Sequence, residues 1–484
     1  MIHSLKLINR QQGAALLLFI LIIMISMAGF YASLIDPEEL RIRRQAHTIK
    51  SLMIAKEALI AHVVSHYEWK PNDSALSDPP SYEFIRLPCP DFSAAGYEGA
   101  QEGNCGSVNL KNRLGRFPWR SLELDTLRDG SGECLWYAVS GNFKNSNIKS
   151  AINSDSKGRI DIYDKEGETL LYGGSAETRV VAAIIAPGAA LTTQNRQESS
   201  DLPICGGNYT ASNYLESAGG IDNAAFEGLN ADISRLVHFG HGSSNNDIVM
   251  PVTRDELLKA VYTRGDIVKK IEALTKKIAE CISEFGKNNA AYPADKRLPY
   301  AAPIALPDYN DNDLYDDEDW QLTGRIPYKV DTSKSKVNSA AQSVFFDSCS
   351  NELSIESSES RKLFHHWKEQ FFYAVSQDRS PDSTATSPSC TMGSCVTVNG
   401  KEYAAIIFYS GSSLASQTRN APPDIAQGLD TKSVIANYLE DENVNRFIEN
   451  TGSGIYQANQ PVTESFNDLA YCIDSENLAV TVCT

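Results

Sequence analysis

The feature that most constrains this chain is an uncharged, apolar run close to its N-terminus. Residues 13–35 contain no charged side chain, and Lys6 and Arg10 precede them. A helix of this length, rising about 1.5 Å per residue, would cross a hydrocarbon core about 30 Å thick. The sequence therefore predicts one membrane-spanning helix, with most of the chain outside the cytoplasm because basic residues before a span stay inside. The alternative is a secretory signal that is cleaved after a small residue such as Ala32.

A second helix is predicted directly after Asp36 and Pro37. Between Leu40 and Val64 apolar residues recur at helical spacing, and no Gly or Pro interrupts the pattern. An amphipathic helix of this kind needs a folded domain to cover its apolar face. The 484 residues of the chain are too many for one hydrophobic core, so at least two domains are expected.

Composition and motifs argue against two classes of function. The net charge of −17 argues against a nucleic-acid partner, because a phosphate-binding surface needs an excess of basic residues. The sequence has no G-x-S-x-G, phosphate-binding loop, H-E-x-x-H or dinucleotide fingerprint. We therefore expect no enzymatic activity.

Hydrophobic patterns predict strands before a long helix. Strands are expected at 135–139, 159–163 and 179–185, and the last is a nearly continuous apolar run, as in a buried strand. Residues 252–285 begin with a capping pattern and continue as an amphipathic helix. Residues 287–335 form a connector rich in Pro, Asn and Asp.

The sequence contains an internal repeat. Three blocks recur in the same order: 136–140 as 372–376, 182–185 as 404–407, and 213–216 as 437–440. The second block is followed in both copies by a Leu, a Gln and an Arg, which are Leu191, Gln194 and Arg196, then Leu414, Gln417 and Arg419. We expect the shared Gln and Arg to fix a loop rather than to take part in catalysis. The repeat predicts two copies of one small α/β unit.

The predicted fold class is α+β, with a long N-terminal membrane-spanning helix followed by two related, strand-rich α/β lobes with a helical insert. The predicted segments are a leader at 1–13, the membrane-spanning and amphipathic helix at 14–68, the first lobe at 69–230, the helical insert and acidic connector at 231–335, and the second lobe at 336–484.

All ten cysteines follow the apolar run, and an even count on the exported side of a membrane predicts disulfides. Short spacing favours three pairs: Cys89 with Cys105, Cys390 with Cys395, and Cys472 with Cys483. The alternative is reduced, buried cysteine. No zinc site is expected, because no CxxC pair occurs and the histidines do not cluster with cysteines.

An acidic segment is the one candidate for a metal site, and calcium is the one candidate cofactor. Oxygen-bearing side chains occupy positions 1, 3, 5, 9 and 12 of a calcium loop, namely Asp308, Asn310, Asn312, Asp316 and Asp319. The segment departs from the pattern at position 6, where Asp313 replaces Gly, and at position 12, where Asp replaces Glu. The alternative is a solvated acidic linker.

The N-terminus resembles that of the type IV pilin and pseudopilin superfamily. Its basic leader ends in Gly13, and Ala14 begins the apolar segment. A turn, Asp129-Gly130-x-Gly132, is similar to the head-domain turn of pseudopilins. The resemblance implies cleavage between Gly13 and Ala14 by a prepilin peptidase. Most members carry Glu at the fifth mature position, where this chain has Leu18, and this departure is similar to large minor components at a filament tip.

By this resemblance the chain is expected to be a membrane-anchored, minor pilin-like or pseudopilin-like structural component of a type IV pilus or type II secretion assembly. The expected localisation is the inner membrane, crossed once, with a periplasmic body that is incorporated into a filament. The expected partners are other pilin subunits along the N-terminal helix, prepilin peptidase and membrane lipid, with no nucleic acid. The alternative function is an anchored periplasmic or surface binding protein, adhesin-like and calcium-dependent.

Overall fold

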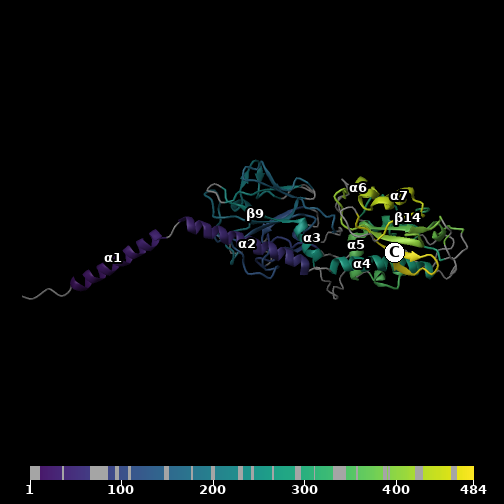
Figure 1. Ribbon diagram of the computed structural model, residues 1–484. Helices are drawn as coiled ribbons and strands as arrows, with labels where there is room; N and C mark the ends of the chain where they lie inside the picture. The colour runs from purple at the N-terminus through teal and green to yellow at the C-terminus, as the bar shows by residue number, and fades with distance from the viewer. Residues whose placement is uncertain are drawn as a thin grey trace, which may run out of the picture.

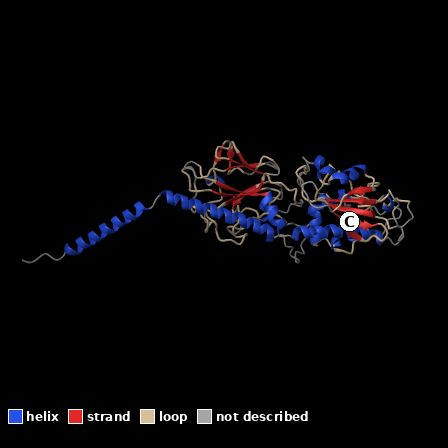
Figure 2. Ribbon diagram, in the orientation of Figure 1, coloured by secondary structure: helices blue, strands red, loops and turns tan. Residues whose placement is uncertain are grey.

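The computed structural model shows an α+β molecule with two lobes and one projecting helix (Figure 1, Figure 2). It describes residues 11–34, 37–65, 85–92, 97–106, 111–145, 152–175, 178–197, 202–226, 233–240, 245–263, 266–288, 296–309, 311–330, 345–355, 358–384, 390, 393–419, 429–458 and 466–483. Within these ranges the α-helices are α1 (Gln11–Leu34), α2 (Pro37–Ser65), α3 (Arg254–Thr263), α4 (Asp266–Lys287), α5 (Glu359–Trp367), α6 (Leu429–Ser433) and α7 (Asp441–Glu449).

Helix α1 projects away from both lobes (Figure 1), and its side chains are described from Leu16 to Met27. Among the described residues, no helix is long and apolar enough to cross a membrane. The predictions of a membrane-spanning helix and of a single-pass inner-membrane localisation with a periplasmic body are therefore wrong.

The prediction of a second helix is confirmed by α2, which lies along the first lobe (Figure 1). Leu52, Ala55, Leu59 and Val63 are fully buried and recur every three or four residues, so they form one face of the helix. That face packs against β5 and β9 of the first sheet. Each buried Leu or Val stabilises the contact by about 1.5–3 kcal/mol.

Sheet 1 is built mainly of antiparallel strands in the order β1-β2-β5-β3-β4. Strand β9 extends it beside β5, and β8 pairs in parallel with β3. The three predicted strands are confirmed as β2, β3 and β5. The strands are β1 (Arg113–Arg116), β2 (Trp136–Val139), β3 (Ile160–Tyr163), β4 (Leu170–Tyr172), β5 (Val180–Ala186), β8 (Ser234–Val237) and β9 (Ile248–Thr253), with a separate short hairpin of β6 (Ser217–Ala218) and β7 (Ile221–Asp222).

Sheet 2 repeats this topology. Its order is β10-β11-β13-β12-β14, with β15 beside β13, β16 beside β15, and β14 parallel to β12. Strands β10 to β15 therefore match β1, β2, β3, β5, β8 and β9, and the two sheets are copies of one arrangement. The strands are β10 (Thr323–Arg325), β11 (Phe371–Val375), β12 (Val396–Val398), β13 (Lys401–Tyr409), β14 (Gly454–Tyr456), β15 (Leu469–Asp474) and β16 (Val480–Val482).

The repeat includes a long helix in each lobe. Helix α4 packs on β13 and β15, the strands that match those under α2. Its buried face is apolar at helical spacing, as the sequence predicts, with Ile267, Ile271, Leu274, Ile278 and Ile282. We call α2 with sheet 1 lobe 1, and α4 with sheet 2 lobe 2.

The predicted boundaries of the insert at 231–335 need correction. Strands β8 and β9 lie within that range but pair with β3 and β5, so lobe 1 extends to Thr253. Helix α4 and strand β10 also lie within it and belong to lobe 2. Helix α3 lies between β9 and α4 in the chain, and it packs on α2, β9 and α4. Alternating side chains of each strand fill the two faces of each sheet, and one hydrophobic cluster runs continuously beneath the helix faces of both sheets.

The predicted head turn, residues 129–132, connects α2 to the rest of lobe 1 through hydrogen bonds. The Asp129 carboxylate accepts hydrogen bonds from the backbone N–H groups of Ser131 (2.7 Å) and Gly188 (2.8 Å). The Gly130 N–H donates to Thr48 Oγ1 on α2 at 2.8 Å. Gly130 lies so close to the helix that a Cβ atom there would be 2.1 Å from the Arg44 carbonyl oxygen.

Candidate functional site

Each lobe contains an arginine, half-buried in lobe 1 and buried in lobe 2, that organises the turn after its central strand. In lobe 1, Arg196 donates to the carbonyl oxygens of Gly188 (2.7 Å) and Asn213 (3.0 Å) and to Gln194 Oε1 (2.6 Å). The Gln194 amide in turn donates to Glu216 Oε1 at 2.8 Å.

Lobe 2 repeats these bonds atom for atom. Arg419 donates to the carbonyl oxygens of Gly411 (2.7 Å) and Asn437 (2.6 Å) and to Gln417 Oε1 (2.7 Å), and Gln417 donates to Glu440 Oε1 (2.8 Å). The prediction that the shared Gln and Arg fix a loop is confirmed in both copies.

A carboxyl pair closes each network. In lobe 1, Glu216 Oε2 accepts from the Asp247 N–H at 3.0 Å, and Asp247 Oδ2 accepts from the Glu216 N–H at 2.9 Å. Asn223 also donates to Asp247 Oδ2, at 2.9 Å. Burial, and then the charge of Glu216, raise the pKa of Asp247 well above its ordinary value. The folded chain therefore binds this proton more tightly than an exposed aspartate would.

The pair Glu440 and Asp468 occupies the same place in lobe 2, with Asn443 donating to Asp468 Oδ2 at 3.2 Å. Burial, and then the charge of Glu440, raise the pKa of Asp468 well above its ordinary value. Since all four carboxyl groups are buried, these pairs are suited to holding turns rather than to acting on a substrate.

Two arginines that the sequence analysis missed complete the networks. Arg116 lies over the ring of Tyr214, 4.2 Å from its centroid, and Arg325 lies 5.4 Å from that of Tyr438. The sequence contains a signal for these two arginines, because the same Gly-Arg dipeptide ends both β1 and β10. An Asn-Asp dipeptide likewise precedes β9 at 246–247 and β15 at 467–468.

The acidic segment at 308–319 lies on lobe 2 beside two lysines. Asn312 Oδ1 accepts a hydrogen bond from Lys368 Nζ at 2.5 Å, and Asp313 pairs with Lys329 at 2.7 Å. Burial lowers the pKa of Lys368 to about 8, although the charges of Glu369, Asp308 and Asp311 act in the opposite direction. Two lysine side chains of the same chain, Lys368 and Lys329, thus lie against the segment and balance part of its negative charge.

Of the other predicted calcium ligands, Asp308 lies close enough for its charge to act on Lys368. Asp316 and Asp319 are exposed, and the Asp316 backbone pairs with that of Lys329. Asn310 lies outside the described residues. In the ranges that the structure describes, no group of three or more His, Cys, Asp or Glu side chains could hold a metal ion.

Four disulfides occur among the described cysteines. Two of them join predicted partners, Cys89 with Cys105 and Cys472 with Cys483. The other two join residues distant in sequence, which spacing could not pair: Cys134 with Cys205 and Cys281 with Cys349. The structure does not join Cys390 to Cys395; both are buried, and Cys390 Sγ lies 3.6 Å from Ser376 Oγ.

The predicted processing residues, Gly13 and Ala14, fall within the bounds of α1, but their side chains are outside the described set.

A polar segment of lobe 1, residues 152–156, joins the lobes. The Ile152 N–H donates to His366 Nδ1 at 3.0 Å, and Gln370 Nε2 donates to Ser154 Oγ (2.8 Å) and Asp155 Oδ2 (2.9 Å). Burial holds the pKa of His366 well below its ordinary value, so the ring is neutral and can accept. Asp155 also faces Arg419 of lobe 2 at 3.9 Å.

Comparison with known proteins finds no matching family model, no matching curated protein and no matching solved structure.

Proposed function

We propose that this chain is a minor pilin-like or pseudopilin-like structural component of a type IV pilus or type II secretion assembly. In this assembly, α1 packs beside the equivalent helices of neighbouring subunits. The observation that carries the proposal is the exposure of α1: its apolar side chains from Leu16 to Ile25 are 40–70% exposed.

Such a surface is unfavourable in water. Covering one Leu or Ile side chain is worth about 1.5–3 kcal/mol, and contiguous apolar patches of this kind mark interaction sites. No charge interrupts the stretch 16–27, so the partner that covers it must itself be apolar. The N-terminal helices of pilin-like subunits have this character.

The design of lobe 1 also supports the proposal. One half of a long helical segment is buried on a strand-rich head, while the other half projects from it (Figure 2). The Asp129-Gly130 turn holds the buried half in place through Thr48. Two lobes on one such helix make a body that is hard to repeat along a thin filament, which favours a minor component at the tip.

The first test is the N-terminal residue of the mature chain, by intact mass, from cells with and without prepilin peptidase. We expect peptidase-dependent loss of residues 1–13. Gly13→Leu should block this cleavage, whereas Ala32→Leu should leave it unchanged. A mature chain that began after Ala32, or an uncut chain, would remove the proposal's support.

A second test separates assembly from binding alone. Co-purification with other pilin-like subunits should be lost in Leu18→Lys, which places a charge in the apolar stretch, and retained in Lys269→Gln, which alters an exposed position on α4. A processed chain that captured no such subunit would favour the alternative of a binding protein.

A further inference from the structure

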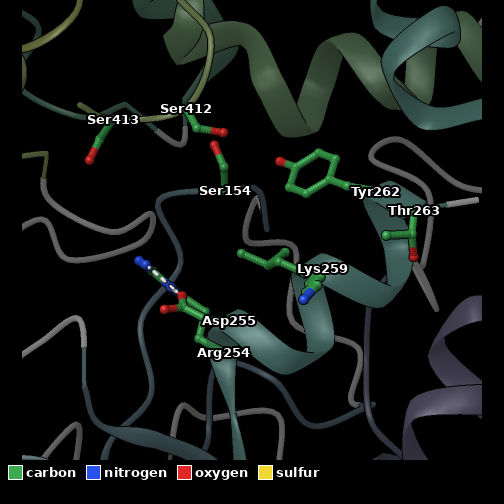
Figure 3. Close-up of a pocket in the computed structure, with 9 residues that line it drawn as sticks. Ser154, Arg254, Asp255, Lys259, Tyr262, Thr263, Ser412 and Ser413 are labelled. Carbon is green, nitrogen blue, oxygen red and sulfur yellow. Dashed lines mark hydrogen bonds and ion pairs between the residues drawn. The ribbon is translucent and has the colours of Figure 1, made fainter. Parts of the chain in front are cut away.

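A cavity of about 470 Å³ lies where the two lobes meet (Figure 3). Helix α3, which lies between the lobes, and Ser154 of lobe 1 line it on one side, and Ser412 and Ser413, in the turn after β13 of lobe 2, line it on the other. Clefts between domains are common places for ligands, because two rigid bodies can contribute convergent polar groups.

Five of the nine residues that line the cavity carry a hydroxyl group. They are Ser154, Tyr262, Thr263, Ser412 and Ser413. Figure 3 shows the Tyr262 hydroxyl directed toward Ser154 and Ser412. Because Ser154 Oγ already accepts a hydrogen bond from Gln370, its own proton is available to donate. Burial raises the pKa of Tyr262, although hydrogen bonding with Ser154 and Ser412 acts in the opposite direction, so this phenol keeps its proton.

The charges around the cavity are more positive than negative. Arg254 and Lys259 line it from α3, and Asp255 pairs with Arg254 at 2.9 Å. Behind the lining, Asp155 faces Arg419. Within the lining, Arg254 and Lys259 therefore stand against one carboxylate, Asp255, in a chain whose net charge is −17. Lys259 is the cation that no carboxylate of the lining balances.

The internal repeat shows that the hydroxyls of Ser412 and Ser413 are not needed for the turn. The matching residues of lobe 1 are Ala189 and Ala190. The backbone is held in the same way in both copies, since the Ser412 carbonyl accepts from Asn467 at 2.7 Å and that of Ala189 accepts from Asn246 at 2.8 Å. The hydroxyls occur only in the copy whose turn lines the cavity.

We propose that this cavity binds a small oxyanion, a phosphate or a carboxylate, held by the serine and tyrosine hydroxyls and by Lys259. The ligand would contact both lobes at once. Its recognition needs donors and positive charge, which this lining supplies from α3 and from the turn after β13. This inference concerns the lobe junction and does not depend on the assembly of α1.

Isothermal titration of the full chain with inorganic phosphate and, separately, with malonate tests the proposal. We expect one of the two to bind with a Kd below about 1 mM. Binding of phosphate alone would identify a phosphate ligand, and binding of malonate alone a carboxylate ligand. Binding of neither would overturn the proposal.

Variants locate the site. The double variant Ser412→Ala and Ser413→Ala should fold, because lobe 1 carries Ala at both matching positions, and should weaken binding about tenfold. Lys259→Gln should weaken it similarly, while Lys269→Gln controls for the loss of one positive charge. Unchanged affinity in the double variant would also overturn the proposal.

Discussion

Replacing Gly130 by Ala should loosen α2 from lobe 1. A Cβ atom at this position would lie 2.1 Å from the Arg44 carbonyl oxygen and 2.7 Å from its Cα. These are backbone atoms of α2, so no side-chain rotation can relieve the clash. Thr48 Oγ1, which donates to the same carbonyl at 3.0 Å, fixes that oxygen further.

The expected cost follows from two changes. Overpacking costs about 1–3 kcal/mol. Moving the turn away from α2 also breaks the bond between the Gly130 N–H and Thr48, which contributes about 1 kcal/mol. The sum, about 2–4 kcal/mol, corresponds to a 30- to 700-fold increase in the opening of α2, at tenfold per 1.4 kcal/mol.

Hydrogen exchange followed by mass spectrometry reports this opening directly, through the amides of the buried half of α2. Gly132→Ala is the matched control: its φ of +89° makes Ala strained by about 1–2 kcal/mol, but no atom lies within 4 Å of the new Cβ. The amides of α2 should therefore exchange much faster in Gly130→Ala than in Gly132→Ala. Equal protection of α2 in wild type and Gly130→Ala would refute the reasoning.

Three further predictions concern the core and the twin networks. Leu59→Ala should destabilise lobe 1 by about 2–5 kcal/mol in urea denaturation, because the side chain is fully buried; a loss under about 1 kcal/mol would contradict the packing described. Arg419→Met should lower the thermal stability more than Arg196→Met, because the carboxylate beside Arg419, Asp155, is buried, whereas Glu133 beside Arg196 is partly exposed; the reverse order would argue against that contact. The raised pKa of Asp468 means that the folded chain binds its proton more tightly than the unfolded chain, so the stabilisation is complete below the ordinary pKa of 3.8 and is lost as the pH rises through the folded value. Asp468→Asn should therefore flatten the decline of stability with rising pH, and an unchanged slope in urea titrations at several pH values would count against a proton held by this pair.

Much of the fold could be predicted because periodicity and repetition are local signals. The buried run at β5 and its copy at β13 share the Ala-Ala-Ile-Ile sequence, and the Gln and Arg that follow have equal spacing in both. Equal spacing around a central strand is what a duplicated turn requires, so the sequence indicated both lobes and the role of Arg196 and Arg419.

The edges of the lobes could not be predicted in the same way. Strands β1 and β10 share only a Gly-Arg pair, although nearly all of their residues are buried, so the sequence repeat is too short there to mark them. The sequence predicts α4 as part of an insert, because an amphipathic pattern does not indicate which sheet will cover the apolar face of the helix. The cavity at the junction depends on side chains that folding brings together from α3, Ser154 and Ser412. Their spacing along the chain does not predict that they lie close together.

The direct connection between the lobes has a mechanical consequence. Strand β9 runs without a break into α3, only two residues separate α3 from α4, and Lys56 of α2 pairs with Glu256 of α3 at 2.6 Å. A load applied to lobe 2 would therefore be carried through the packed helices α4, α3 and α2 into the central strands of lobe 1. The two lobes would then move together under tension on the N-terminal helix, and the hydrogen bonds of the 152–156 segment would resist their separation.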